Sequence, residues 1–278
     1  LPIVFVILVF QVQIVGGWRI KILPRYNFVA NDYPANILKT VGKNGTLYLH
    51  EEVDETIFTL SYMKNVLKKR QDITITDSYN NIFLSKNVPE KSKKYYSAVN
   101  TAKLNKTLFL NGLLWVEQKK INSSIRDFYV VRELQKKYEY REQEVVARYP
   151  YFYGKFLIDS GDKKDGILEL KKSLKVGPEL IWLHNNVGDI LRQNKDYNDA
   201  YLTLIKAIRL DSSYSPSYYN MGLLYLEKKD DNNAIEYFQK AYQYDKTDTD
   251  SLFQLSKIYQ RKGYEKFVNG KIDDAITE

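Results

Sequence analysis

The chain has 278 residues, 44% of them hydrophobic, and it carries 42 Lys and Arg against 34 Asp and Glu, a formal net charge of +8. This length and hydrophobic content are sufficient for two folded units. The sequence contains no cysteine, which excludes a disulfide framework and a thiolate metal site, and its two histidines, His50 and His184, have no ligand partner at a useful spacing. We therefore expect no cofactor, no metal ion and no histidine-based catalytic triad.

The positive charge is confined to the first half of the chain. Residues 1–146 hold 22 Lys and Arg against 14 Asp and Glu, whereas residues 147–278 hold 20 of each. One interpretation is attraction of the first half to anionic lipid head groups or to a phosphate-bearing substrate. The other is a solvated surface without a ligand. No nucleic-acid-binding motif accompanies the charge, so nucleic acid is not expected as a partner.

Residues 1–18 begin with the uncharged run Leu1–Val15, and the first charged residue is Arg19. A complete membrane span needs about 20 apolar residues, so this segment predicts the end of a transmembrane helix, with Trp18 at the membrane interface. A buried strand and the remains of a signal peptide are the alternatives. Since the chain also starts without methionine and ends inside a predicted helix, we expect it to be a fragment of a longer protein.

Residues 19–120 have the pattern of a small α/β domain. Residues 45–50 alternate as a strand, residues 55–69 have helical spacing, and residues 72–77 form a second alternating run. A strand, a helix and a strand joined by short links predict a βαβ unit and hence a Rossmann-like layer. The helix is expected to bury Ile57, Leu60, Met63 and Leu67, and residues 79–83 and 108–116 are expected to add strands.

A cluster of acidic residues, Glu52, Asp54 and Glu55, follows the first predicted strand. Open α/β sheets bind ligands at the carboxyl ends of their strands, so this cluster is a possible acidic ligand site that would hold a divalent cation or orient an acceptor. The alternative is a helix N-terminus that simply favours negative charge.

Several residues of the same region form a pattern that would directly follow a membrane helix. They are Asp32, Tyr33, Asn36, Leu38, Asp54, Tyr62, Arg70 and Asp72, followed later by the segment Asn111-Gly-Leu-Leu-Trp115. In these positions the first 120 residues resemble the protein O-mannosyltransferase-like family, glycosyltransferase family 117. The chain departs from the family pattern where Glu52-Val-Asp54-Glu replaces Gly-Asp-x-Asp.

This resemblance implies the extracytoplasmic C-terminal region of a multi-pass membrane glycosyltransferase, which transfers a sugar from a lipid-phosphate donor to a protein or other acceptor. The catalytic acid of such an enzyme is expected in an early loop outside this chain, so no catalytic residue is assigned here. The soluble part would be periplasmic or lumenal, although Arg19, Lys21 and Arg25 alone favour the cytoplasmic side. The alternative is a membrane-anchored adaptor without catalysis. A third possibility, a soluble regulator, would require Leu1–Val15 to be a core strand.

From residue 147 onwards the chain repeats with a period of 34 residues. Three columns of small residues keep this interval: Gly154, Gly188 and Gly222; Gly166, Ala200 and Ala234; and Ser173, Ala207 and Ala241. A helical hairpin needs small residues where its helices cross and where it meets the next hairpin. The pattern resembles the tetratricopeptide family and predicts an all-α solenoid. We expect a helical connector at 121–146, repeats at 147–180, 181–214 and 215–248, and a partial repeat at 249–278.

The partial repeat is irregular, because its second helix is expected at Gly270–Ala275, seven residues later than the period places it. Two extra turns in its first helix would account for the delay.

Stacked hairpins form a concave groove lined by the first helix of each repeat. The residues expected to line it occur in pairs four residues apart, so both members share one helix face. They are Tyr151 and Lys155, Asn185 and Asp189, Tyr219 and Leu223, and Phe253 and Lys257. A mixed aromatic and polar lining suits an extended peptide or a partner helix, so we expect a protein or peptide as the partner. The alternative is that the aromatic residues pack between the repeats.

Overall fold

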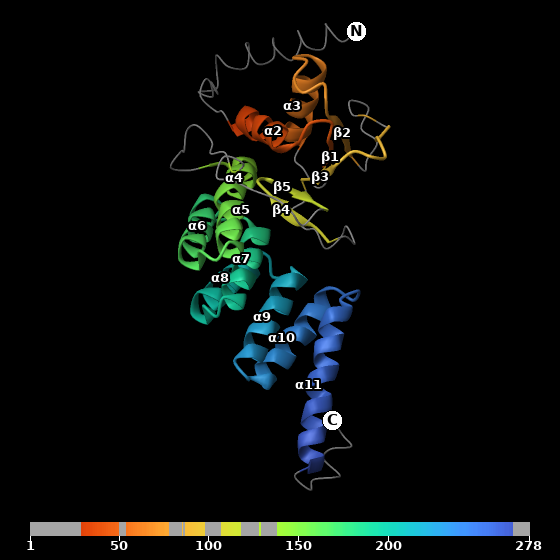
Figure 1. Cartoon of the computed structure of the whole chain (residues 1–278). Coiled ribbons are helices and arrows are strands. Elements are labelled where there is room, and N and C mark those ends of the chain that lie inside the picture. The colour runs from red at the N-terminus through yellow and green to blue at the C-terminus, as the bar shows by residue number, and fades with distance from the viewer. Residues whose placement is uncertain are drawn as a thin grey trace. The chain divides into compact units, whose positions relative to one another are not determined.

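The computed structural model describes residues 29–49, 54–77, 85, 87–97, 107–117, 128 and 138–268. Contacts divide the chain into two compact units, Leu1–Lys137 and Tyr138–Glu278 (Figure 1). The predicted end of a transmembrane helix at 1–18 lies outside the described residues, as do Glu52, residues 79–83 and Gly270–Ala275. Within the described ranges, no helix is both long and apolar enough to cross a membrane.

The first unit contains a mixed five-stranded sheet in the order β2-β1-β3-β5-β4. β1 (Thr46–Leu49) pairs in parallel with β2 (Thr74–Asp77) and with β3 (Lys94–Tyr96), whereas β5 (Leu114–Val116) pairs antiparallel with β3 and with β4 (Phe109–Asn111). Helix α3 (Asp54–Asn65) connects β1 to the parallel β2, which confirms the predicted strand–helix–strand unit. The sheet itself is mixed, because its last two strands form an antiparallel hairpin.

That hairpin replaces the single strand predicted at residues 108–116. The chain turns between Asn111 and Leu114, where Gly112 has a φ of 63°. Gly is favoured at the first position of such a two-residue loop, because it adopts positive φ without the steric cost that a side chain would add. Strand β3 was not predicted at all, since its Lys-Tyr-Tyr sequence is short and has no alternation to recognise.

Helix α2 (Val29–Thr40) packs against α3. The core of the unit includes Tyr33, Ile37, Leu47 and Leu60, all almost fully buried. Of the residues predicted for the buried face of α3, Leu60 and Met63 are buried and Ile57 is half-buried, but Leu67 is 45% exposed. The prediction for Leu67 was wrong because α3 ends at Asn65, before the helical face reaches it.

The end of α2 is held by one arginine from the turn before β2. Arg70 donates from Nη1 to the carbonyl of Leu38 and from Nη2 to the carbonyl of Gly42, at 3.3 Å. The same guanidinium binds both carboxylate oxygens of Asp72, each at 2.9 Å. The hydrogen bond from Arg70 lowers the pKa of Asp72 to about 2. Two of the residues that match the glycosyltransferase pattern therefore stabilise the contact between the end of α2 and the turn before β2.

In its described residues, 138–268, the second unit is built of helices. Its helices are α4 (Tyr140–Val146), α5 (Arg148–Asp159), α6 (Lys163–Val176), α7 (Ile181–Gln193), α8 (Tyr197–Leu210), α9 (Ser215–Glu227), α10 (Asp231–Tyr244) and α11 (Thr249–Val268). α5 packs with α6, α7 with α8 and α9 with α10, so three hairpins follow one another, and α4 packs on α5. Helix α11 has 20 residues, seven more than α9, which agrees with the two extra turns predicted from the sequence.

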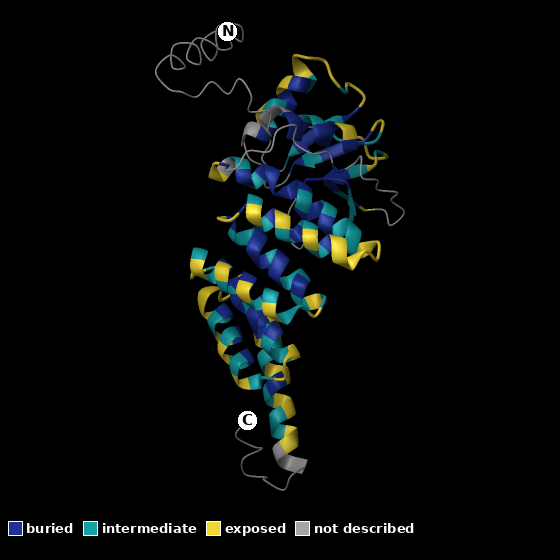
Figure 2. Cartoon of the chain, turned by 90° about the vertical axis from the view of Figure 1, so that its left-hand side faces the viewer, coloured by how far each residue is buried: buried dark blue, intermediate teal, exposed yellow. Residues whose placement is uncertain are grey.

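The three glycines in register lie where the two helices of each hairpin cross. A Cβ atom on Gly188 would lie 2.7 Å from Cγ of Leu204, and one on Gly222 would lie 2.7 Å from Cδ1 of Phe238. Real Cβ atoms do not approach other atoms so closely, so any larger residue would push the helices apart. The small residues that follow in register, Ala200, Ala207, Ala234 and Ala241, are fully buried, which confirms that packing is the cause of the repeat. Figure 2 shows buried faces of the helices in dark blue.

Candidate functional site

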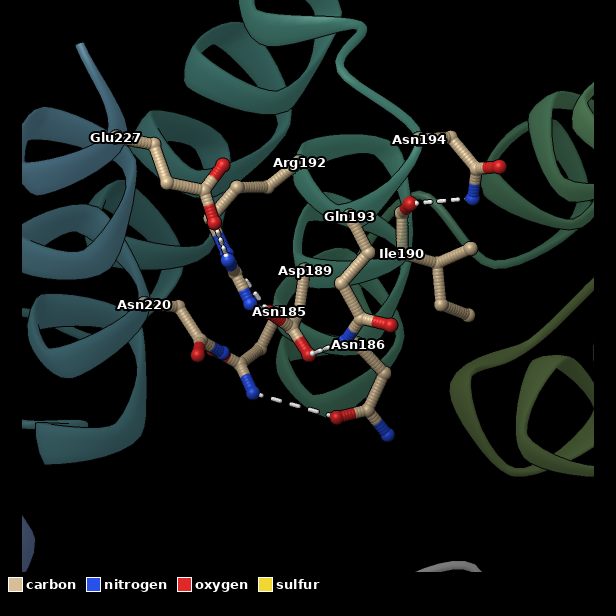
Figure 3. Close-up of polar contacts among 9 residues, drawn as sticks. All are labelled: Asn185, Asn186, Asp189, Ile190, Arg192, Gln193, Asn194, Asn220 and Glu227. Carbon is tan, nitrogen blue, oxygen red and sulfur yellow. Dashed lines mark hydrogen bonds and ion pairs between the residues drawn. The ribbon is translucent and has the colours of Figure 1, made fainter.

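The first helices of the successive hairpins are α5, α7, α9 and α11, and they carry all eight residues predicted to bind a partner. We call the side that carries these residues the first-helix face. α7 and α9 contact each other directly along it. Nδ2 of Asn220 on α9 donates a hydrogen bond of 3.0 Å to Oδ1 of Asn185 on α7 (Figure 3). Asn185 in turn donates from Nδ2 to Oδ1 of Asn186, at 3.3 Å.

The same offset of 35 residues recurs along the array. Asn186 is a hydrogen-bonding partner of Tyr151, and Gln254 is one of Tyr219. In both tyrosines burial raises the pKa of the hydroxyl, and the amide partner opposes that shift. Tyr151, Asn185 and Tyr219 occupy the same position in successive repeats, and each contacts the residue 35 positions later. These side-chain hydrogen bonds connect the first helix of one repeat to the first helix of the next.

Arg192 makes a second connection with this spacing. Nη2 of Arg192 lies 2.6 Å from Oδ1 of Asp189 on the same helix, α7. The guanidinium also forms an ion pair with Glu227 on α9. Gln193 also donates to Asp189, from Nε2 to Oδ2 at 2.8 Å. Burial acts to lower the pKa of Arg192, but the two carboxylates outweigh it and the pKa is raised. The positive charge of Arg192 is thus compensated by two carboxylates of the array, and the carboxylate of Asp189 is paired with Arg192.

The eight predicted residues divide into two groups by exposure. Tyr151 and Asn185 are 5% and 4% exposed, so they contribute mainly to contacts between repeats. Tyr219 and Leu223 are half-buried and pack against the cluster of Ala234, Phe238 and Ile258. Lys155 and Asp189 are half-buried, whereas Phe253 and Lys257 are exposed. Only the α11 pair therefore offers a largely accessible apolar and cationic surface.

Phe253 and Lys257 are joined by a cation–π contact, with Nζ of Lys257 lying 4.2 Å from the centroid of the Phe253 ring. Phe253 is 55% exposed. Such a pair holds an aromatic ring and a positive charge in one place. It can contact an apolar side chain and a carboxylate of a ligand at the same time.

Sequence reasoning missed the other residues of this face. They are Trp182, Asn186, Arg192, Asn220, Glu227 and Gln254. Trp182 packs edge-on against Tyr151, with ring centroids 5.5 Å apart, and its Nε1 donates to Oε2 of Glu144 at 2.9 Å. A signal for part of this set was present, because Asn186, Asn220 and Gln254 form a column of amides with the same 34-residue period as the glycines.

The side chains of the possible acidic ligand site in the first unit are not among those that the structure describes. Glu52 is outside the described residues, and Asp54 and Glu55 are described only as the first residues of α3. Among the described residues, no group of three or more His, Cys, Asp or Glu is placed to hold a metal ion.

Comparison with known proteins supports the helical repeats. The tetratricopeptide repeat family matches residues 183–214 and 215–248. No curated protein matches the chain at a significant level. The C-terminal part of the chain therefore carries tetratricopeptide repeats, and the comparisons give no evidence for the O-mannosyltransferase family.

Three solved structures illustrate the likeness. A crystal structure of MamA is 24% identical, covering 47% of this chain and 72% of that one with a TM-score of 0.37. The first TPR of Spaghetti (RPAP3) bound to the HSP90 peptide SRMEEVD is 18% identical, covering 41% and 91% with a TM-score of 0.38. YrrB, described as a TPR protein with an unusual peptide-binding site, is 17% identical, covering 41% and 62% with a TM-score of 0.36.

Proposed function

We propose that the first-helix face of the repeats binds an extended segment of a partner protein. The observation that carries this proposal is the column of amides at Asn186, Asn220 and Gln254, followed by the exposed pair of Phe253 and Lys257. Asn220 uses Nδ2 for its bond to Asn185, and its Oδ1 has no hydrogen-bond partner among the described residues. An amide oxygen held in this way can accept a hydrogen bond from a peptide N–H group.

The chemistry of the face indicates what kind of segment it would bind. An extended peptide presents N–H and C=O groups along its length, and side-chain amides can serve both kinds of group. The Phe253 ring would pack on an apolar side chain, and Lys257 beside it would attract a carboxylate. A peptide with an apolar residue next to an acidic one is therefore the ligand that this face fits best.

The proposal is tested with peptides selected from a random display library on the immobilised full chain. The affinity of a selected peptide is then measured by fluorescence polarisation for two pairs of variants. Phe253→Ala and Lys257→Ala change the exposed pair. Leu202→Ala and Lys206→Ala, at exposed positions on α8, are the matched controls. We expect about a tenfold weaker binding, the size of a hot-spot contact, for the first pair only. Equal loss in both pairs, or in neither, would reject the first-helix face as the binding surface.

We further propose, from the resemblance of residues 1–120, that the repeats select the acceptor of a membrane glycosyltransferase on its periplasmic or lumenal side. The supporting observation is that five of the matching residues lie in α2 or in the turn that binds its end. Asp32, Tyr33 and Asn36 are buried in α2, and Arg70 and Asp72 lie against its end. Genomic sequence before Leu1 that encodes several further apolar spans would support this role. A single span would instead favour the non-catalytic membrane-anchored adaptor, which needs only the peptide-binding face.

A further inference from the structure

Helix α3 carries apolar residues on two faces, one of which is buried and the other largely exposed. Its inner face carries Thr56, Leu60 and Met63, which are at most 2% exposed. Its outer face and the turn after it carry four large apolar side chains that are exposed. They are Phe58 at 55%, Tyr62 at 48%, Val66 at 58% and Leu67 at 45%, and we call them the α3 patch. A contiguous apolar surface of this kind marks an interaction site more often than chance exposure does.

The α3 patch is a continuous stripe. Phe58, Tyr62 and Val66 are four residues apart, and residues at this spacing share a helix face. The helical bond continues past the last residue of α3, because the amide of Val66 donates to the carbonyl of Tyr62 at 2.9 Å. The amide of Leu67 donates to the same carbonyl at 3.1 Å, so backbone hydrogen bonds hold Val66 and Leu67 against the last turn of α3.

Two exposed lysines lie in the turn at the end of the stripe. Four cations lie between residues 64 and 70, and the fold uses two of them: Lys64 donates to the carbonyl of Ile73, and Arg70 binds Asp72 and the end of α2. Lys68 and Lys69 are exposed, and neither forms an ion pair with a residue that the structure describes. The sequence has no acidic residue between Glu55 and Asp72. The patch therefore adjoins two exposed lysines that pair with no carboxylate among the described residues, in a turn that is exposed in Figure 2.

We propose that the α3 patch, with Lys68 and Lys69, binds the surface of an anionic lipid bilayer. Tyr and Phe side chains favour the interface of a bilayer, where the ring lies among the head groups and the acyl boundary. Lysines beside them attract anionic head groups, and charge attraction and apolar burial together give stable peripheral binding. A neutral protein surface would gain nothing from the two exposed lysines beside the patch. This surface is separate from the first-helix face and does not depend on the peptide-binding proposal.

The test uses a local probe, because the apolar run Leu1–Val15 would carry the whole chain to many bilayers whatever α3 does. The chain has no cysteine, so Val66→Cys creates a single site for an environment-sensitive fluorophore such as NBD. Leu202→Cys, on α8 and 64% exposed, gives the matched control probe. Vesicles of phosphatidylcholine containing phosphatidylserine are compared with vesicles of phosphatidylcholine alone. We expect a several-fold rise and a blue shift of the emission at position 66 with the anionic vesicles only, and no change at position 202.

A charge reversal separates lipid binding from a general effect of the label. In the Val66→Cys chain, Lys68→Glu with Lys69→Glu is expected to abolish the rise in emission. Lys228→Glu with Lys229→Glu, an adjacent exposed pair in the repeats, is expected to leave it unchanged. An unchanged probe at position 66 on anionic vesicles would overturn the proposal, and so would an equal response to neutral vesicles. A blue shift that grows with protein concentration in the absence of lipid would also overturn it, because the patch would then bind a second copy of the chain.

Discussion

Asn185 on α7 accepts a hydrogen bond of 3.0 Å from Asn220 on α9, and the two residues are 35 positions apart, one more than the repeat. Asn185 is buried and Asn220 is half-buried, so this bond is only partly covered by the array. Residues that were expected to meet a partner are thus used to bind the next repeat.

The first prediction concerns this bond. Asn220→Ala leaves Oδ1 of the buried Asn185 without that donor, and an unsatisfied buried group costs about 1–3 kcal/mol. We expect a lower free energy of unfolding in urea, followed by far-ultraviolet circular dichroism. Asn232→Ala, an exposed asparagine on α10, is the matched control and should change the free energy of unfolding very little. If both substitutions had the same effect, the bond between α7 and α9 would contribute nothing specific.

The second prediction concerns the crossing of α9 and α10. Gly222→Ala places a methyl group 2.7 Å from Cδ1 of Phe238, which is fully buried. Overpacking of this kind costs about 1–3 kcal/mol, so the midpoint of urea unfolding should fall. The same substitution in a Phe238→Leu chain should cost less, because the ring that the methyl group meets is absent. Equal costs in the two backgrounds would show that the contact with Phe238 is not the reason for the glycine.

The third prediction is a dependence of stability on pH. Burial lowers the pKa of His184, although its hydrogen bond to the carbonyl of Pro178 opposes the shift. Below the ordinary histidine pKa of about 6.5, the unfolded chain therefore binds a proton that the folded chain does not. The free energy of unfolding of the repeats should fall as the pH drops through that value.

The two histidines of the chain provide the control for this experiment. His184→Gln should flatten the pH dependence of the thermal midpoint between about pH 7.5 and pH 5.5, the range in which histidine titrates. His50→Gln, in the first unit, should leave that dependence in place. A dependence that persists in the His184 variant would have to come from other groups.

The fourth prediction concerns the contact between α2 and the turn before β2. Arg70→Gln removes the donors to the carbonyls of Leu38 and Gly42, so the last turn of α2 should open more often. Hydrogen exchange followed by mass spectrometry should show faster exchange in residues 35–42, with the repeats unaffected. Lys43→Gln, at an exposed position close to the same helix end, is the control.

The partner of Arg70 gives this contact a pH signature. The pKa of Asp72 is lowered to about 2 in the fold, so its contribution to stability is present above the ordinary value of about 4 and is lost as the pH falls towards 2. Asp72→Asn should therefore speed exchange at the end of α2 at neutral pH. The difference from the unmodified chain should vanish near pH 2, and a difference that is independent of pH would contradict the assigned ion pair.

Local patterns predicted several elements of this protein. Strand β1, helix α3 and strand β2 follow from alternation and helical spacing within short segments, and the length of α11 follows from the delay of seven residues in the fourth repeat. The α3 patch could not be predicted in the same way. Leu67 continues the spacing of the buried face, and the sequence does not show that α3 already ends at Asn65, so Leu67 was predicted to be buried but is exposed.

The sequence by itself determined the array of helical hairpins, because the 34-residue columns of small residues are required wherever two helices cross closely, and this contact is local to each repeat. Only the tertiary structure decided which residues of the first helices remain accessible. Tyr151 and Asn185 are covered by contacts with Trp182, Asn186 and Asn220, whereas Phe253 and Lys257 lie on α11, where they are exposed. The exposure of each side chain depends on how successive hairpins stack, and no single repeat contains that information.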